Sequence, residues 1–252
     1  MASLYQLKPA FQGLLRPLVR ALARAGISAN QVTLAGLLLS IAAGLALAAY
    51  PHHAPALLAV PLVMLLRMAL NAIDGMLARE HRMQTALGGF LNELCDVASD
   101  CALYLPFTLV LPQAAAWVVL LTVLAVLVEF AGVVAQALGG SRRYDGPMGK
   151  SDRAFVFGLI ALLLGLGVAP GQWCVMLLAL ACALSVVTLC RRIKLGSLEI
   201  EMLRQPGRRG AGAAAAPPTG TAAQPPLASA ASAASAVERI PHNNKEDRGG
   251  AP

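Results

Sequence analysis

Apolar residues dominate six stretches of this chain, and short polar connections separate them. The apolar stretches cover residues 31–50, 55–79, 87–111, 114–138, 153–169 and 173–191. Several of them approach the roughly 20 residues that a helix needs to cross a bilayer. The alternation typical of a transmembrane strand is absent over any useful length. We therefore expect an all-α, polytopic membrane protein with six transmembrane helices, which form a membrane domain over residues 31–195.

The segment before the first apolar stretch, residues 1–30, combines basic and apolar residues at helical spacing. Its two neighbouring stripes consist of Arg16, Arg20, Arg24, Leu15, Leu18 and Leu22. This pattern indicates an amphipathic helix that lies in the headgroup plane and ends near Gly26, before Ser28 opens the first span. A simple basic flank of the first span explains the arginines equally well.

The last segment, residues 196–252, follows the final apolar stretch, and from Gln205 onward it consists largely of Ala, Pro, Gly and Ser. Such a composition offers too little large apolar surface to offset the entropy lost on ordering. We expect a low-complexity, disordered cytoplasmic tail.

Charge alternates between the connections. Residues 51–53, 112–113 and 170–172 carry no Lys or Arg, whereas residues 79–82, 142–153 and 191–194 are basic. The positive-inside rule then places both termini and the basic connections in the cytoplasm. The net charge of +7 fits loops that face anionic lipid headgroups, so we expect no nucleic-acid partner. We expect a multi-pass protein of the cell inner membrane.

Four polar side chains gather near the cytoplasmic ends of the second and third spans. Asn71 and Asp74 are three residues apart on one span, and Asn92 and Asp96 are four residues apart on the next, so each pair shares a helix face. The hairpin turn near residue 83 places Asp74 opposite Asn92 and Asn71 opposite Asp96. A charged group in hydrocarbon costs about 2.5–3.5 kcal/mol on insertion scales and therefore indicates a partner or a function. Oxygen ligands at one depth predict a site for Mg²⁺ or Mn²⁺.

The same hairpin geometry pairs Arg67 with Asp100, one turn deeper than the four polar residues. We predict a structural ion pair between them beneath the metal site, because a buried charge requires a partner. Glu129 on the fourth span lies at similar depth and is the alternative partner for Arg67.

Small residues accompany the polar cluster. Gly75 and Ala78 lie about one turn apart beside Asp74, and Gly88 opens the third span. They would allow a nucleotide-sized ligand to approach the helix backbones, although small residues also serve ordinary helix packing in membranes.

The spacing of these residues resembles the signature of the CDP-alcohol phosphatidyltransferase family, D-x2-D-G-x2-A-R-x8-G-x3-D-x3-D. Every interval matches in this chain, and the similarity in topology covers about residues 28–195. The start of the first span, Asn30-x2-Thr33, is also similar, although more weakly. The signature residues of this chain are Asn71, Asp74, Gly75, Ala78, Arg79, Gly88, Asn92 and Asp96.

Asn71 and Asn92 stand where the family signature has aspartate, so the chain resembles a divergent member of the family. An Asn carbonyl can still bind a divalent cation, but each replacement removes one negative charge. The site then holds one metal ion, or it binds a second one together with the substrate diphosphate. A shifted register with Asp96 and Asp100 as the last two acids would restore a carboxylate, but it breaks the spacing to Gly88.

The resemblance implies transfer of a phosphatidyl group from a CDP-activated lipid such as CDP-diacylglycerol to an alcohol, with release of CMP, in phospholipid biosynthesis. It implies metal ligation by Asn71, Asp74, Asn92 and Asp96, with Asp96 as general base. It also implies a homodimer and CDP binding by Asp74, Gly75, Ala78, Arg79 and Gly88.

The connection after the fourth span carries four basic residues that could bind an acceptor phosphate: Arg142, Arg143, Lys150 and Arg153. Positive-inside charge alone would also explain them. No residue distinguishes a small alcohol from a polyol phosphate as the acceptor. Two other functions stay open, namely a catalytically weak relative that binds CDP-lipid and a membrane transporter.

Overall fold

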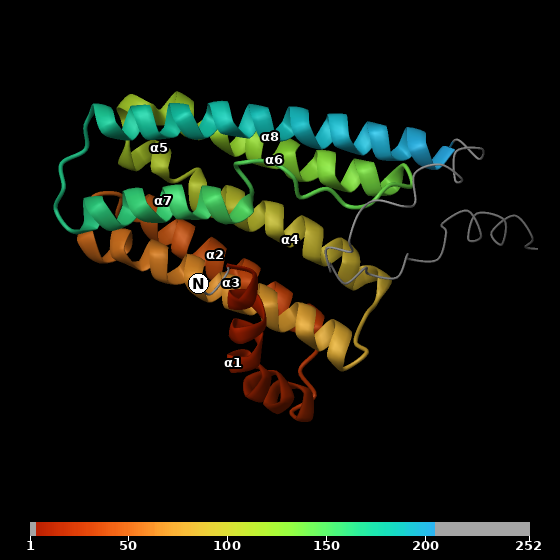
Figure 1. The fold of residues 1–252 in the computed structure, drawn as a ribbon. Helices are drawn as coiled ribbons and strands as arrows, with labels where there is room; N and C mark the ends of the chain where they lie inside the picture. Colours follow the sequence, from red (N-terminus) through yellow and green to blue (C-terminus); the bar gives the residue numbers. More distant parts are fainter. Residues whose placement is uncertain (1–3, 205–252) are drawn as a thin grey trace, which may run out of the picture. The chain divides into compact units, whose positions relative to one another are not determined.

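The computed structural model describes residues 4–204, and it describes side chains from residue 11 onward. Every regular element in that range is helical (Figure 1). The elements are α1 (Leu4–Arg24), α2 (Ala29–Ala49), α3 (Ala54–Glu80), α4 (Ala86–Tyr104), α5 (Phe107–Val110), the 3₁₀ turn η1 (Pro112–Ala114), α6 (Ala115–Ala137), α7 (Lys150–Gly165) and α8 (Gln172–Arg204).

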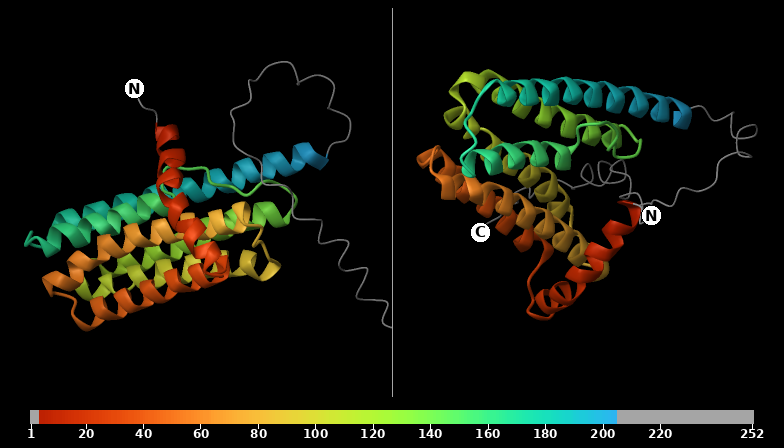
Figure 2. Two further views of the ribbon diagram at one scale, coloured as in Figure 1. Left: turned by 90° about the horizontal axis from the view of Figure 1, so that it is seen from below. Right: turned by 60° about the vertical axis from the view of Figure 1, so that its left-hand side comes forward.

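The long helices α2, α3, α4, α6, α7 and α8 run side by side (Figures 1 and 2). Helix α2 packs on α3 and α4, α3 packs on α7, and α6 packs on α8. Successive helices run in opposite directions, so the starts of α2, α4 and α7 meet the ends of α3 and α6 and the second half of α8. This end of the bundle carries the polar residues that the sequence singles out.

Four helical segments between residues 29 and 204 are long and apolar enough to cross a membrane: Ala29–Ala49, Ala54–Glu80, Pro112–Ala137 and Gln172–Arg204. The chain is therefore an all-helical polytopic membrane protein over its described part. The predicted third span, 87–111, is interrupted before α5 at Pro106, which has no backbone N–H to continue the helix. The predicted fifth span corresponds to α7, which has only 16 residues.

Helix α1 crosses the bundle at a steep angle beside α3 (Figure 2). Val19 is fully buried in a small apolar cluster with residues of α3, and Arg16 Nη2 lies 3.0 Å from Glu80 Oε1. The chain turns after α1 at Gly26, whose φ of +75° suits glycine. Ser28 then caps α2 and accepts a hydrogen bond from the backbone N–H of Gln31.

The boundary predicted for the C-terminal tail is wrong for residues 196–204, which continue α8. Gly196 and Ile200 are buried in this extension, and Ser141 donates from its backbone and its hydroxyl to Glu199. These contacts with the end of α6 and the following loop stabilise a helix that composition alone does not predict. The rest of the predicted tail, from residue 205, lies outside the described residues.

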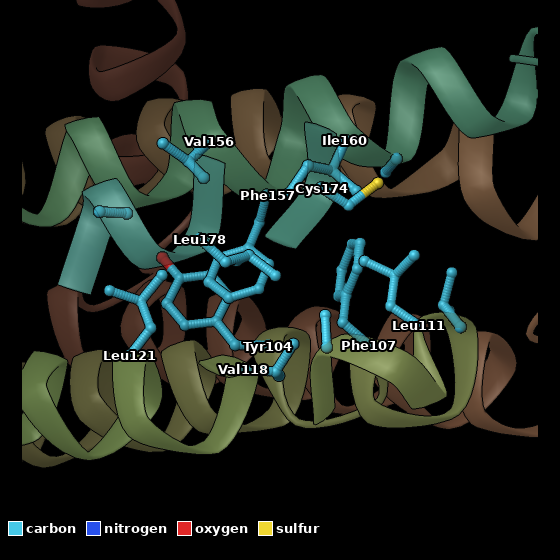
Figure 3. Packing of buried hydrophobic residues seen from close by; sticks show 14 of the residues in the cluster. Tyr104, Phe107, Leu111, Val118, Leu121, Val156, Phe157, Ile160, Cys174 and Leu178 are labelled. Atoms are coloured by element: carbon cyan, nitrogen blue, oxygen red, sulfur yellow. The ribbon is translucent and has the colours of Figure 1, made fainter. Parts of the chain in front are cut away.

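An aromatic core joins α4, α5 and α7 deeper in the bundle than the polar end. The rings of Tyr104 and Phe157 stack with centroids 4.1 Å apart, and Phe107 packs against Phe157 at 5.0 Å (Figure 3). All three side chains are fully buried. Large buried rings fix helix positions through area and shape, so this core holds α4 and α7 in register for the polar residues at their N-terminal ends.

Candidate active site at one end of the bundle

Asp74 is a buried carboxylate on α3, with 5% of its residue surface exposed. Its Oδ2 accepts a hydrogen bond from the hydroxyl of Thr33 on α2 at 2.8 Å. Within residues 11–204, no Lys, Arg or His nitrogen lies within ion-pair distance of Asp74. A buried charge without a charged partner is unfavourable unless a cation completes the site.

Asp96 on α4 lies in a different environment, because three nitrogen donors surround its Oδ1. Asn71 Nδ2 donates to it at 3.1 Å, Lys150 Nζ forms an ion pair with it, and Arg67 Nη2 lies 3.6 Å away. The structure thus brings Asn71 and Asp96 into direct contact across the α3–α4 hairpin. The second predicted pair, Asp74 and Asn92, is not joined by a hydrogen bond in the described chain, and Asn92 is exposed.

The two glycines of the signature lie in close contacts, Gly75 within α3 and Gly88 between α2 and α4. A Cβ on Gly75 would lie 3.1 Å from Arg79 Nη2, so the guanidinium of Arg79 folds back over this glycine. A Cβ on Gly88 would lie 2.6 Å from Asn30 Oδ1, so Gly88 lets the starts of α2 and α4 approach each other. Ala78 packs against the apolar cluster that also holds α1.

Arg67 and Asp100 lie in contact one turn below. Arg67 Nη1 is 2.6 Å from Asp100 Oδ1, and both side chains are 5% exposed. Arg67 Nη2 also donates to the backbone oxygen of Asp96 at 2.9 Å, which ties the ion pair to the α4 backbone beside the site. No ion pair joins Arg67 to Glu129 in the described residues.

Glu129 on α6 instead receives three guanidinium groups. Arg153 Nη2 lies 3.0 Å from its Oε1, and Arg142 and Arg192 lie 3.3 and 3.5 Å from its Oε2. One carboxylate therefore joins α6, α7, α8 and the loop before α7. Charge-assisted contacts of this kind are strong where burial lowers the effective dielectric constant.

The four basic residues of the α6–α7 connection and the first turn of α7 all form ion pairs. Arg142 Nη1 lies 2.7 Å from Glu93 Oε1, and Arg143 lies 2.8 Å from Asp145 Oδ2 and 3.0 Å from Glu199 Oε2. Those partners add to the contacts of Lys150 with Asp96 and of Arg153 with Glu129. Arg153 is fully buried, which leaves its guanidinium little access to a ligand.

Comparisons with known proteins identify the family. The family model of the CDP-alcohol phosphatidyltransferases matches residues 27–200. The chain belongs to this family. It is 46% identical over 203 residues to the inner membrane protein YnbA of Escherichia coli, which covers 79% of this chain and 100% of YnbA. It is 32% identical over 167 residues to an uncharacterized protein of Aquifex aeolicus, which covers 64% of this chain and 81% of that protein.

Solved structures show the same fold. The phosphatidylinositol phosphate synthase of Mycobacterium tuberculosis, in complex with manganese and citrate, superposes with a TM-score of 0.61 at 23% identity, over 76% of this chain and 90% of that chain. The same enzyme with CDP-DAG bound gives a TM-score of 0.61 at 23% identity, over 76% of this chain and 94% of that chain. At this identity the likeness establishes the phosphatidyltransferase fold.

The phosphatidyltransferase chain offers hard oxygen donors for a divalent cation. Residues 11–204 contain no cluster of three or more His, Cys, Asp or Glu side chains placed to hold a metal ion. Asp74 and Asp96 supply two carboxylates, and Asn71 and Asn92 supply amide oxygens. Mg²⁺ in proteins is commonly held by one or two carboxylates together with substrate phosphates. The donor set and the uncompensated charge of Asp74 therefore fit one such ion.

Four members of the ion-pair network were not recognised from the sequence. The sequence patterns did not single out Glu93, Arg192 and Glu199, because their partners lie on elements far away in sequence, nor Asp145, whose partner Arg143 is two residues away in the loop before α7. Arg192 carried a usable signal, however. It continues at helical spacing a stripe of small or polar residues on α8, all of them buried: Ala181, Ser185, Thr188, Arg192 and Gly196.

Proposed function

We propose that this phosphatidyltransferase moves a phosphatidyl group from a CDP-activated lipid, such as CDP-diacylglycerol, to an alcohol and releases CMP, as a step of phospholipid biosynthesis. One observation carries the proposal: Asp74 is buried and has no cationic partner among residues 11–204. It lies on the helix next to that of Asp96, inside the region that the family model matches. An unpaired buried carboxylate is useful where a cation and a diphosphate bind together.

The membrane arrangement follows from the fold and the charge pattern. We propose that all six long helices span the membrane, with α1 in the headgroup plane and both termini in the cytoplasm. The similarity to an inner membrane protein of E. coli supports the cell inner membrane as the location. The site then lies at the cytoplasmic end of the bundle, where a lipid donor keeps its acyl chains in the bilayer while its polar group reaches the carboxylates. The homodimer implied by the resemblance stays a prediction.

The donor diphosphate would bind at Arg79. This guanidinium folds over Gly75 beside Asp74, and no carboxylate within the described range pairs with it. An unpaired guanidinium binds phosphate oxygens through charge-assisted hydrogen bonds. Asp74, Gly75, Ala78 and Gly88 would line the nucleotide side, where the small residues bring backbone atoms close to the ligand. The solved relative with CDP-DAG bound supports a ligand of this class.

Asp74 and Asp96, with the amide oxygens of Asn71 and Asn92, would hold Mg²⁺ or Mn²⁺. A divalent cation held there would neutralise charge at the diphosphate and stabilise the leaving CMP. The manganese in the complex of the solved relative supports this choice.

In the proposed reaction, a carboxylate oxygen of Asp96 accepts the proton of the acceptor hydroxyl. The freed oxygen forms a bond to the lipid-side phosphorus, and the bond from that phosphorus to the bridging oxygen breaks, so that CMP leaves with the electron pair. Asn71 and Lys150 hold the Asp96 carboxylate in place from α3 and α7. Arg67 orients the α4 backbone at Asp96 from below.

The test follows CMP release by the purified protein in detergent with CDP-diacylglycerol, Mg²⁺ or Mn²⁺ and a panel of alcohols. We expect metal-dependent release that falls roughly a hundredfold or more in Asp74→Ala and Asp96→Ala. The matched control is Glu201→Gln, which changes an exposed acid at the end of α8. Unimpaired turnover in both Asp variants would falsify the site.

A second candidate function has one observation in its favour. Two of the four ligand positions are amides, and Lys150 already occupies one oxygen of Asp96. A site of this kind could bind CDP-lipid and turn it over weakly. Saturable binding of CDP-diacylglycerol without CMP release over the whole acceptor panel would support this binding protein, whereas ion flux in liposomes would support a transporter.

A further inference from the structure

We propose that the acceptor is an uncharged polyol, an alcohol without a phosphate group, and that Glu93 excludes phosphorylated alcohols by neutralising Arg142. This proposal rests on the function proposed above and names its second substrate. It departs from the prediction, made from the basic residues of the α6–α7 connection, that an acceptor phosphate binds there.

The choice between a phosphorylated and an uncharged acceptor depends on Arg142. Its guanidinium lies between two carboxylates, with Nη1 at 2.7 Å from Glu93 Oε1 and Nη2 at 3.3 Å from Glu129 Oε2. Its side chain is only 14% exposed and already contacts Glu93, so a phosphate would have to compete with Glu93 for Arg142. Breaking a largely buried ion pair costs much of its interaction energy, because the released carboxylate loses its partner in a poorly solvated place.

The other three cations also form ion pairs with carboxylates. Lys150 binds Asp96, Arg143 binds Asp145 and Glu199, and Arg153 binds Glu129 without any exposure. Arg67 and Arg192 share two of these carboxylates, so the network balances six cations with six carboxylates, namely Glu93, Asp96, Asp100, Glu129, Asp145 and Glu199. The acceptor side of the site therefore lacks the surplus positive charge that a second anion needs beside the donor diphosphate.

A phosphate would have to compete with these carboxylates, which the fold holds against the guanidinium groups at high effective concentration. Its charge would also lie near Asp96 and the remaining carboxylates, and like charges repel strongly where water is scarce. A hydroxyl group does not face this competition.

Glu93 also provides a hydrogen-bond acceptor for an uncharged polyol. Its side chain is 33% exposed, and its contact with Arg142 uses Oε1, which leaves Oε2 able to accept a hydrogen bond from a hydroxyl group. Glu93 lies one turn before Asp96 on α4, close to the group proposed to deprotonate the acceptor. One carboxylate thus repels phosphate and accepts from a hydroxyl.

The test compares matched acceptors in the CMP-release assay: glycerol with glycerol 3-phosphate, and inositol with inositol phosphate. We expect kcat/KM to be at least about tenfold higher for each uncharged alcohol. In Glu93→Gln the ratio should move by roughly tenfold toward the phosphorylated acceptor, because Arg142 loses one of its two neutralising partners. The control Glu201→Gln should leave the ratio unchanged. A wild-type preference for the phosphorylated acceptors would overturn the proposal and leave the phosphatidyl transfer intact.

A binding measurement decides the proposal even without turnover. Calorimetric titration of the protein with inorganic phosphate should show no saturable binding for the wild type and saturable binding for Glu93→Gln. That gained binding should disappear in the double variant Glu93→Gln/Arg142→Met. Saturable phosphate binding by the wild type that Arg142→Met removes would overturn the proposal, as would a Glu93→Gln variant that binds no phosphate.

Discussion

Arg67 Nη1 lies 2.6 Å from Asp100 Oδ1, and each side chain is 5% exposed. The contact joins α3 to α4 one turn below Asp96, and the second Nη of Arg67 donates to the Asp96 backbone. The ion pair is therefore positioned to fix the depth at which Asn71 and Asp96 meet.

Removing one member of this ion pair should destabilise the protein more than removing both. Arg67→Met or Asp100→Leu removes the 2.6 Å contact and leaves the remaining buried charge with only a 3.6 Å neighbour, Arg153 for Asp100 or Asp96 for Arg67. Such a change should cost about 3 kcal/mol. The double variant removes both charges, so its loss should be smaller than either single loss, apart from the lost bond to the Asp96 backbone. Thermal unfolding in detergent measures all three. Simply additive losses would show that the two residues are energetically independent.

Glu129→Gln should be more destabilising than Glu93→Gln. Glu129 neutralises Arg142, Arg153 and Arg192, which lie 3.0 to 3.5 Å away, whereas Glu93 neutralises Arg142 alone. Removing the Glu129 charge leaves buried guanidinium groups facing one another, at an expected cost of about 3 kcal/mol or more. Unfolding temperatures of the two variants in the same detergent give the comparison. Equal losses would mean that burial of Glu129 adds nothing.

The contacts within the α3–α4 hairpin could be predicted because they depend only on helical periodicity and one short turn. Arg67 contacts Asp100, and Asn71 contacts Asp96, at the positions that this geometry gives. The six apolar runs likewise correspond to helices, except where Pro106 interrupts the third. Both outcomes follow from local rules.

The partners of Glu129 and Asp96 from other helices could not be predicted in this way. Arg192 and Lys150 reach them from α8 and α7, and nothing in the sequence separation fixes how those helices rotate against α4 and α6. Positive-inside charge alone explains the basic residues of the α6–α7 connection, so their pairing with carboxylates became visible only in the packed structure.

Gly146→Ala should destabilise the α6–α7 connection and lower the rate of CMP release. Gly146 has a φ of +121°, and a Cβ there would lie 2.5 Å from Thr188 Cγ2. Thr188 also accepts a hydrogen bond from the backbone N–H of Met148, so a shift at Gly146 would move the segment that leads to Lys150. The expected cost is about 1–3 kcal/mol.

Gly139→Ala is the matched control for this change. Gly139 also has a positive φ, +94°, but a Cβ there would meet no atom within 4 Å. Its cost should therefore reflect backbone strain alone, about 1–2 kcal/mol, with little effect on turnover. Unfolding temperature and CMP release measured on both variants separate strain from displacement. If Gly139→Ala impaired CMP release as much as Gly146→Ala did, the contact with Thr188 would have no special role.

Asp74→Asn should make the metal-free protein more stable while it removes the response to metal. Asp74 is buried and has a hydroxyl donor in Thr33 but no cationic partner in the described structure, so its charge is unfavourable before a cation binds. The amide keeps an acceptor for Thr33 and removes the charge. Without divalent metal, the variant should unfold at a temperature about 2–4 °C higher than the wild type. Adding Mn²⁺ should raise the unfolding temperature of the wild type, because the ion binds the folded state, and should leave that of the variant nearly unchanged.

Glu201→Gln, which removes an exposed charge, should behave as the wild type in both measurements. A variant less stable than the wild type without metal, or equally stabilised by Mn²⁺, would show that Asp74 is a structural residue whose charge the fold already compensates.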